Sequence, residues 1–312
     1  MAKKNEGGAK VLKSVSGARA AGVRLDLYMI GAFDSLSRKQ AKKLLDGKKV
    51  SLNGKIEMMA SRIVNAGDRV EVRIDPPREA PVPPQKLDTL FKDEHLLAVL
   101  KPPFIPSGET KDPGRLTAEV LAKKAHGAGL KLLHRLDRDT TGVLLFGLTG
   151  ESSAAVLAEF KKREVKKTYL AIVAGKPPQT FEDSRHLKEI PGGKVATVMS
   201  GGLRAFTTFT TLAAAKGCAL IEARPETGRM HQIRAQLSAR GYPLLGDSLY
   251  GGAPRVRLGE EEIEVPRQML HAWKLSFVHP ATGLEVEIVA PVPEDFRELT
   301  KTLFGKTPWG KG

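Results

Sequence analysis

The sequence predicts an α+β protein made of a small N-terminal domain and a larger domain with a mixed, largely antiparallel sheet. Many short apolar segments are separated by turn residues with few helices between them, which favours such a sheet over a doubly wound parallel one. A proline-rich linker at 77–87 separates the two parts, because proline-rich chain is stiff and extended. The length of 312 residues also suits about two domains of ~100–200 residues each.

The N-terminal part is predicted to begin with a flexible basic tail at 1–20, which lacks hydrophobic periodicity, and to fold over 21–76. Residues 24–30 carry apolar side chains at helical spacing, and a basic helix is expected to start near Ser37, which can cap it. Residues 69–74 alternate apolar and charged side chains, as a half-exposed strand does. Together these elements predict a small α/β domain.

The larger domain is predicted over 88–305 and is followed by a loose C-terminus at 306–312. Its expected strands lie at 96–100, 143–148, 167–175, 219–224 and 284–289, and its expected helices at 116–125, 151–162 and 229–240. The strand at 143–148 is a short apolar run, which indicates that it is buried. The charged residues just before it therefore lie next to the core, where they form either a structural ion-pair cluster or a functional site.

The charge of the chain indicates a polyanionic partner. The formal net charge is +15 and the sequence pI is about 9.8, which favours nucleic acid ahead of a membrane surface. The alternative is a generic charge that only keeps the protein in solution. No apolar segment reaches the ~20 residues of a membrane span and the first residues lack a signal-peptide core, so a cytoplasmic protein is expected.

Several cofactor classes lack their sequence signatures in this chain. Cys218 is the single cysteine, so no intramolecular disulfide can form. The histidines include no close pair at metal-ligand spacing, and no bound metal is expected. The glycine patterns of phosphate-binding and dinucleotide-binding loops are absent, so no nucleotide cofactor is expected.

Three stretches combine residue types that carry chemistry. The first is HRLDRDTTG at 134–142, the second is KTYLA from Lys167, and the third is TGRMHQIR at 227–234, followed by GDSLYG at 246–251. In this order the three stretches resemble the RluA family of RNA pseudouridine synthases. The resemblance extends over residues 88–300 and implies the pseudouridine-synthase fold for the larger domain.

The resemblance also implies the reaction. A uridine in RNA loses its glycosidic bond, the uracil turns, and the base is rejoined to the sugar through carbon 5, without cofactor or metal. The expected partner is structured RNA, with ribosomal RNA favoured over transfer RNA, and the protein is expected to be a monomer.

The N-terminal domain is similar to the αL-type RNA-binding motif, which precedes the catalytic domain in other members of the family. The matching pattern consists of Arg24, Asp26, Ser37, Arg38, Gly47, Val50, Asn53, Gly54, Gly67, Asp68 and Val70. The similarity implies that the basic helix contacts RNA. Its basic side chains are Arg38, Lys39, Lys42 and Lys43. Taken alone, the same pattern also describes an ordinary solvated helix.

The resemblance assigns roles to four residues of the larger domain. Asp137 would be the catalytic carboxylate, and Arg234 would hold it ionised, because a planar guanidinium can donate two hydrogen bonds to a carboxylate. Tyr169 would pack its ring near the target base and the aspartate. Arg135 would fill the gap left by the flipped uridine. Four further residues are expected to assist in RNA binding or to support the site: His134, Arg138, Thr140 and His231.

Several alternatives remain at this stage. The carboxylate could attack the sugar, attack the base, or remove a proton. A non-catalytic RNA-binding or ribosome-assembly factor could have the same fold, and a glycoside or nucleoside hydrolase could use Asp137 with Asp139. The chain also departs from the family at Phe104, where a glycine is usual, and at Thr141, where serine is commoner.

Overall fold

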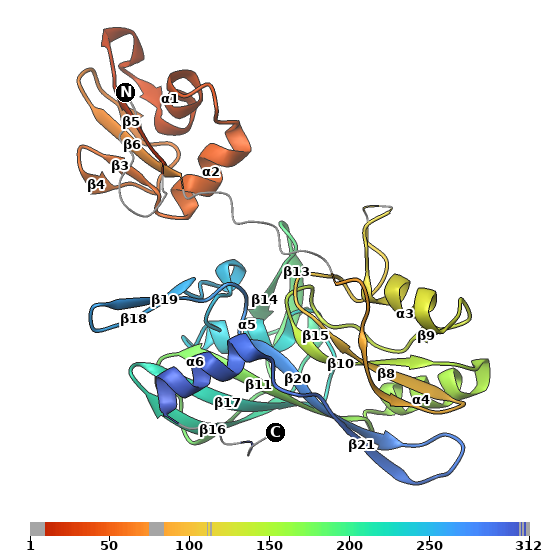
Figure 1. Ribbon diagram of the computed structural model, residues 1–312. Coiled ribbons are helices and arrows are strands. Elements are labelled where there is room, and N and C mark those ends of the chain that lie inside the picture. The colour runs from red at the N-terminus through yellow and green to blue at the C-terminus, as the bar shows by residue number, and fades with distance from the viewer. Residues whose placement is uncertain are drawn as a thin grey trace. The chain divides into compact units, whose positions relative to one another are not determined.

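The computed structural model describes residues 10–74, 84–110, 112, 114–305, 307 and 309. The chain divides into two compact units, residues 1–80 and 81–312 (Figure 1). None of the helices in the described ranges is long and apolar enough to cross a membrane. Most of the predicted linker at 77–87 and of the predicted loose C-terminus lies outside these ranges.

The N-terminal unit contains two helices and a four-stranded sheet with the strand order β1-β6-β3-β4. Its elements are β1 (Lys10–Val15), η1 (Ala18–Ala20), β2 (Val23–Arg24), α1 (Leu25–Ala32), α2 (Arg38–Asp46), β3 (Val50–Leu52), β4 (Lys55–Ile56), β5 (Ile63–Val64) and β6 (Arg69–Ile74). Leu25 and Met29 of α1 pack with Leu45 of α2 and with Val70 and Val72 of β6 in one core. The helices are therefore held by the apolar face of the sheet.

The prediction of a flexible tail over 1–20 is wrong for residues 10–20. Strand β1 pairs antiparallel with β6 from Lys10 opposite Ile74 to Val15 opposite Arg69. Lys13 also forms an ion pair with Glu71 at 2.6 Å. The segment has weak periodicity of its own, and its conformation comes from the backbone of a strand more than fifty residues later. Residues 1–9 lie outside the described part of the chain.

The larger unit is built on a ten-stranded sheet with the path β12-β16-β17-β11-β20-β10-β8-β7, to which β21 and β9 add at β20 and β10. Its strands in that sheet are β7 (Asp88–Lys92), β8 (Leu96–Lys101), β9 (Lys131–Leu132), β10 (Thr141–Gly147), β11 (Lys166–Ala174), β12 (Thr180–Asp183), β16 (Thr207–Ala215), β17 (Cys218–Pro225), β20 (Leu270–Val278) and β21 (Glu285–Val289). Only β10 with β20 is a parallel pair among those in the described sheet. The predicted mixed, largely antiparallel sheet is confirmed.

Two smaller sheets and the helices complete the larger unit. The elements are α3 (Ala118–His126), α4 (Gly150–Lys162), α5 (Gln232–Ala239), η2 (Ser248–Tyr250), α6 (Glu294–Phe304), a sheet of β13 (His186–Ile190), β14 (Lys194–Val198) and β15 (Leu203–Arg204), and the hairpin of β18 (Arg255–Leu258) and β19 (Glu261–Glu264). Helices lie on both faces of the large sheet (Figure 1). On β11, Leu170 packs in the cluster that contains Phe296 of α6, while Ala171 packs with Ile233 of α5. The alternation of β11 thus fixes α5 against one face of the sheet.

Strand β10 is the most enclosed strand of the larger unit and determines where the preceding loop emerges. Its seven residues are all buried. Gly142 has φ +124°, and a Cβ there would lie 2.1 Å from the carbonyl oxygen of Ala272 in β20. Only glycine allows this approach, so the chain before Gly142 leaves the sheet directly beside β20.

Phe104 stands where the family pattern usually has a glycine. Its φ is +68°, in the left-handed region that favours glycine. A side chain in this region costs roughly 1–2 kcal/mol relative to an unstrained residue. The turn after β8 therefore keeps the backbone shape that a glycine would give, and Phe104 tolerates it.

Candidate active site

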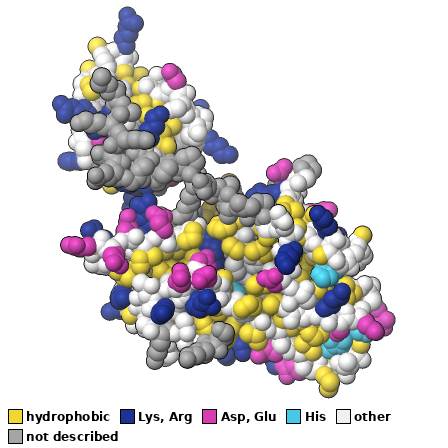
Figure 2. Space-filling model, in the orientation of Figure 1, with side chains coloured by type: hydrophobic (Ala, Val, Ile, Leu, Met, Phe, Trp, Pro, Cys, Tyr) yellow, Lys and Arg dark blue, Asp and Glu magenta, His cyan; other side chains and the backbone are white. Residues whose placement is uncertain are grey.

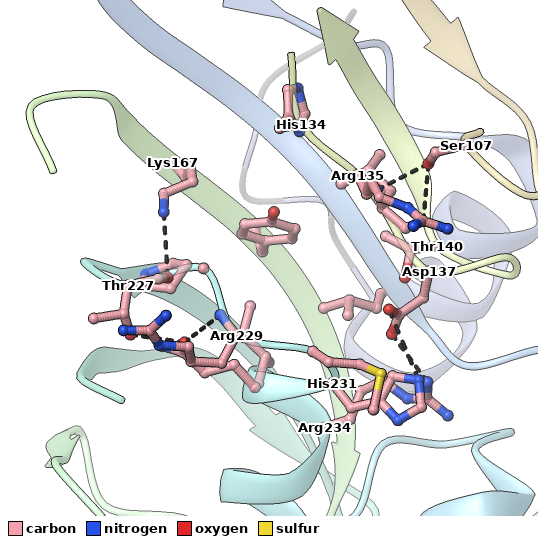
Figure 3. A pocket seen from close by; sticks show the side chains of 18 of the residues that line it. Ser107, His134, Arg135, Asp137, Thr140, Lys167, Thr227, Arg229, His231 and Arg234 are labelled. Carbon is pink, nitrogen blue, oxygen red and sulfur yellow. Dashed lines mark hydrogen bonds and ion pairs between the residues drawn. The ribbon is translucent and has the colours of Figure 1, made fainter. Parts of the chain in front are cut away.

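The three chemistry-bearing stretches meet at one cavity of about 990 Å³ in the larger unit (Figure 3). The loop between β9 and β10 contributes 133–138 and Thr140, β11 contributes Lys167 and Tyr169, and 225–234 contribute the segment that leads into α5. Eight Lys or Arg side chains line the cavity, against the two carboxylates of Asp137 and Glu226. The cavity is therefore suited to a polyanion that presents a neutral group to one carboxylate.

Asp137 and Arg234 point toward one another at one wall of this cavity (Figure 3). The Nη1 of Arg234 donates a hydrogen bond of 2.9 Å to Oδ2 of Asp137. The Asp137 side chain is 24% exposed, whereas that of Arg234 is 8% exposed. The carboxylate can thus be reached from the cavity, and its hydrogen-bond partner is a buried guanidinium.

A second carboxylate, Asp247, holds Arg234 from behind. Nε of Arg234 donates to Oδ2 of Asp247 at 2.7 Å, and Nη2 donates to Oδ1 at 2.8 Å. Asp247 is 2% exposed. The paired geometry predicted between Arg234 and Asp137 is therefore made with Asp247, and Asp137 receives a single hydrogen bond.

Asp247 is a site residue that the sequence did not reveal, although it lies in the GDSLYG stretch at 246–251. The only available signal was chemical, since a buried arginine needs more acceptors than one partly exposed carboxylate supplies. Both carboxylates raise the pKa of Arg234 above its ordinary value against the opposing effect of burial. The guanidinium is permanently charged and fixed in direction.

His231 lies next to this ion pair. Its Nε2 is 3.9 Å from Oδ1 of Asp137, and its Nδ1 is 3.0 Å from the Tyr250 hydroxyl. That hydroxyl accepts from the backbone N–H of Val195 at 2.8 Å, which leaves its own hydrogen for Nδ1. Burial lowers the pKa of His231 below its usual value, so the ring is neutral at neutral pH. In this arrangement Nε2 carries the hydrogen and faces Asp137.

Tyr169 lies on β11 and lines the cavity close to Asp137. Burial, and secondly the negative charge of Asp137, raise the pKa of the phenol well above its ordinary value. Because the phenol stays neutral, Tyr169 offers an uncharged aromatic face to an unstacked base without repelling the carboxylate.

The loop that carries Asp137 is held by buried side chains from distant parts of the chain. The Nζ of Lys101 is fully buried and donates to the carbonyl oxygens of Pro102, Ile105 and Arg138 at 2.8, 2.9 and 2.9 Å. Burial lowers the pKa of Lys101 to about 7, while the three carbonyl groups favour the ammonium form by accepting one hydrogen each. Lys101 therefore fastens the loop one residue after Asp137.

Replacing Lys101 with methionine is expected to lower the free energy of unfolding by about 3 kcal/mol, because three buried carbonyl groups lose their donor. Urea unfolding of the native protein and the variant measures this difference. Lys92→Met is a suitable control, since Lys92 is exposed on β7, and should change the value by less than about 0.5 kcal/mol. A loss below about 1 kcal/mol in Lys101→Met would show that the carbonyl groups find other partners.

Two further buried side chains hold the same loop from the β20 side. Arg267 is 2% exposed, donates two hydrogen bonds to Asp295 at 2.7 and 2.9 Å, and donates to the carbonyl of Asp139 at 3.3 Å. Gln268 donates to the hydroxyl of Thr140 at 2.8 Å. Thr140 is therefore tied to the segment that precedes β20.

Asp139 does not form a carboxylate pair with Asp137 at the cavity. Its two oxygens accept from Nε and Nη2 of Arg138 at 2.7 and 2.9 Å, and Asp139 is not among the residues that line the cavity. A hydrolase would need both carboxylates to face one substrate. The hydrolase hypothesis therefore has no geometric support. Arg138 is in turn occupied by this ion pair.

His134 has a different place from the one expected of an RNA-binding residue. Its Nε2 accepts from the backbone N–H of Leu145 at 3.2 Å, and its ring packs against Phe160. Burial, and secondly Lys167, lower the pKa of His134 to about 3. Although it lines the cavity, His134 is uncharged and hydrogen-bonded to the sheet, so it supplies no positive charge for a phosphate.

The His134 ring makes stability depend on pH. In the folded protein its pKa is about 3, and in the unfolded chain it is near the ordinary 6.5, so its contribution is present above pH 6.5 and is lost as the pH falls toward 3. His134→Gln keeps an acceptor for Leu145 without titrating. The stability of the native protein relative to the variant should fall by about 2 kcal/mol between pH 7 and pH 5, measured by urea unfolding. Parallel pH profiles would show that the ring has the same pKa in the folded and the unfolded chain.

The remaining predicted residues lie at the rim or in the other unit. Arg135 is exposed, lines the cavity, and donates from Nη2 to the carbonyl of Glu109 at 3.3 Å. Arg38, Lys39 and Lys42 are exposed on α2 of the N-terminal unit. The side chain of Lys43 lies outside the described part of the structure.

The chain is similar to known proteins of one family. Residues 95–239 match the family described as RNA pseudouridylate synthase. The chain is 34% identical over 298 residues to the ribosomal large subunit pseudouridine synthase D of Zymomonas mobilis, with 90% of this chain and 94% of that protein covered. The protein of the same name from Vibrio vulnificus is 34% identical over 302 residues, with 90% and 91% covered. The solved structure of human RNA Pseudouridylate Synthase Domain Containing 4 covers 68% of this chain and 91% of its own, with 27% identity and a TM-score of 0.56.

The relatives match this chain over nearly its whole length, and the family match includes the loop of Asp137, the strand of Tyr169 and the helix of Arg234. The chain belongs to the RluA family of RNA pseudouridine synthases, isomerases that convert uridine to pseudouridine in RNA.

Proposed function

We propose that this enzyme modifies uridines of large-subunit ribosomal RNA in the cytoplasm, acting as a monomer, and that Asp137 is its catalytic carboxylate. The observation that carries the assignment of Asp137 is the Asp137–Arg234–Asp247 arrangement at the wall of a cation-lined cavity. The choice of RNA is supported by the relatives named for the large ribosomal subunit.

The chemistry needs a carboxylate that stays ionised beside the sugar of a flipped uridine. Arg234 supplies the opposite charge at 2.9 Å, and Asp247 keeps Arg234 from turning away. The bond between C1′ and N1 of the uridine breaks, the uracil turns, and C5 bonds to C1′. The hydrogen on C5 leaves as a proton, and N1 ends with a proton. Asp137 could act in this sequence by attack on the sugar or the base, or as the base that removes a proton.

The surrounding residues fit the needs of the base. Tyr169 gives the turning uracil a neutral aromatic face. Arg135 lies at the rim, and its side chain donates one hydrogen bond, to the Glu109 carbonyl. Breaking this bond would let Arg135 enter the gap that the uridine leaves. Tyr169 and Arg135 thus each have a role toward one flipped nucleotide.

The N-terminal unit is proposed to bind structured RNA through α2. Arg38, Lys39 and Lys42 are exposed on this helix, and Lys and Arg side chains project from the unit in several directions (Figure 2). Such a surface adds affinity for phosphates that is independent of sequence and sensitive to salt.

The function is tested with unmodified large-subunit ribosomal RNA that carries tritium at carbon 5 of its uridines. Joining carbon 5 to the sugar expels that hydrogen, so the released tritium counts turnovers. Release from ribosomal RNA and none from transfer RNA is the expected result. Release from transfer RNA alone would overturn the proposed substrate but leave the enzyme class intact.

A further inference from the structure

Three positive side chains that line the cavity, Arg163, Lys167 and Arg229, are called here the cationic wall. Lys167 and Arg229 lie across the cavity from Asp137 and Arg234 (Figure 3). The Nζ of Lys167 donates to the carbonyl of Thr227 at 3.2 Å and would lie 3.8 Å from a Cβ at Gly228. The start of β11 and the segment before α5 thus form one continuous surface.

The charge of the cationic wall is not balanced by the protein in the described ranges. None of its three members makes an ion pair with a described carboxylate, and Arg229 instead donates from Nε to the carbonyl of Arg204 at 3.3 Å. Burial, and secondly the charge of Arg163, lower the pKa of Lys167 to about 8. Concentrated positive charge of this kind favours an anion from outside the protein.

Arg163 is held in a backbone conformation that an arginine rarely adopts. It follows α4 with φ +67° and ψ +26°, the left-handed geometry in which helices usually end on glycine. The negative end of the helix dipole explains basic residues in the last turn, such as Lys161 and Lys162. It does not explain a strained arginine that lines a cavity, nor Lys167 and Arg229, which lie outside the helix.

We propose that the cationic wall is a phosphate-binding subsite for the RNA strand that carries the target uridine. This rests on the proposed flipping of a uridine into the cavity. Phosphates next to the flipped nucleotide would bind Arg163, Lys167 and Arg229 on one side, which places the sugar toward Asp137 on the other. The three side chains are positioning residues, since they set the direction of the nucleotide and do not touch the reacting atoms.

The first test measures RNA affinity against salt concentration, with every protein carrying Asp137→Asn so that no turnover occurs. Arg163→Gly and Lys167→Met are each expected to weaken binding on the order of 10-fold and to lower the slope of log K against log salt by about 0.7–0.9 for each lost phosphate contact. Lys162→Met is the matched control. Its side chain is 67% exposed, lies 4.0 Å from Glu164, and does not line the cavity, so its slope should equal that of the parent.

The second measurement separates phosphate binding from a structural role. Arg163→Gly relieves the left-handed strain, so its urea midpoint should rise while its affinity for RNA falls. A residue that only stabilises the helix end would give a lower midpoint. Unchanged salt slopes in both Arg163→Gly and Lys167→Met, or an equal change in Lys162→Met, would overturn the subsite.

The choice of RNA does not confuse the result. The variants are compared on whichever RNA releases tritium with the native protein. A wrong substrate assignment would appear separately, because the native protein would then release no tritium from ribosomal RNA. In that RNA, the variants with Asp137 intact should show a raised KM with little change in kcat. A fall in kcat with an unchanged KM would contradict a positioning role on phosphates.

Discussion

Replacing Asp137 with asparagine is expected to lower the rate of tritium release by at least about 10⁴-fold. Asparagine keeps an oxygen that can accept from Nη1 of Arg234, which now lies 2.9 Å from Oδ2, so the shape of the site is kept and the negative charge is lost. Single-turnover release with excess enzyme measures the chemical step without product release. Equal release by the native protein and the variant would remove Asp137 from the mechanism.

The stability of the Asp137→Asn protein serves as its control. Asp137 is partly exposed and makes one of the three hydrogen bonds between Arg234 and carboxylates. The free energy of unfolding should therefore change by less than about 1 kcal/mol. The affinity for RNA should stay close to the native value. Loss of activity with unchanged affinity would contradict the hypothesis of a non-catalytic assembly factor.

Replacing Asp247 with asparagine is expected to lower the free energy of unfolding by about 3–5 kcal/mol and to reduce activity as well. The Arg234 guanidinium would keep its charge in a buried place with only Asp137 as a charged partner. Arg234 would lose the two charged acceptors that fix its direction and could turn away from Asp137, which would then lose its partner. Urea unfolding gives the stability loss, and kcat at a temperature where the variant is fully folded gives the loss of activity.

Asp183 provides the matched control for Asp247. It is fully buried and accepts from Arg185 and Arg240, yet it does not line the cavity. Asp183→Asn should cost a similar amount of stability and leave kcat of the folded enzyme near the native value. If the two variants lost activity to the same extent, the effect of Asp247 would be one of stability alone.

The fold could be predicted from sequence wherever the local pattern reflects burial. The apolar run at 143–148 predicted the buried strand that the structure shows as β10. The predicted helix at 229–240 instead starts at Gln232, because His231 takes a left-handed backbone with φ +52°. Strand β1 was missed because its conformation depends on pairing with β6. Such long-range pairing leaves little trace in local composition.

The site, like the fold, could be predicted from the sequence only in part. The pairing of Arg234 with Asp137 was expected from the family pattern, and the structure brings the two side chains together. Asp247 was missed because the third partner of an ion-pair cluster has no fixed spacing from the other two. For His134, nothing in the sequence shows that its Nε2 accepts from the backbone of Leu145. Motifs identify residue types, whereas hydrogen-bond direction requires coordinates.

The parallel contact between β10 and β20 has a consequence for how the enzyme is made. Thr141 and Gly142 lie beside His271 and Ala272, and Arg267 and Gln268 hold the loop of Asp137. A growing chain on the ribosome therefore lacks its catalytic geometry until translation has passed residue 272, when most of the protein already exists. Contacts this distant in sequence form late in folding. Unfinished copies of the enzyme would be inactive toward the RNA that surrounds them during synthesis.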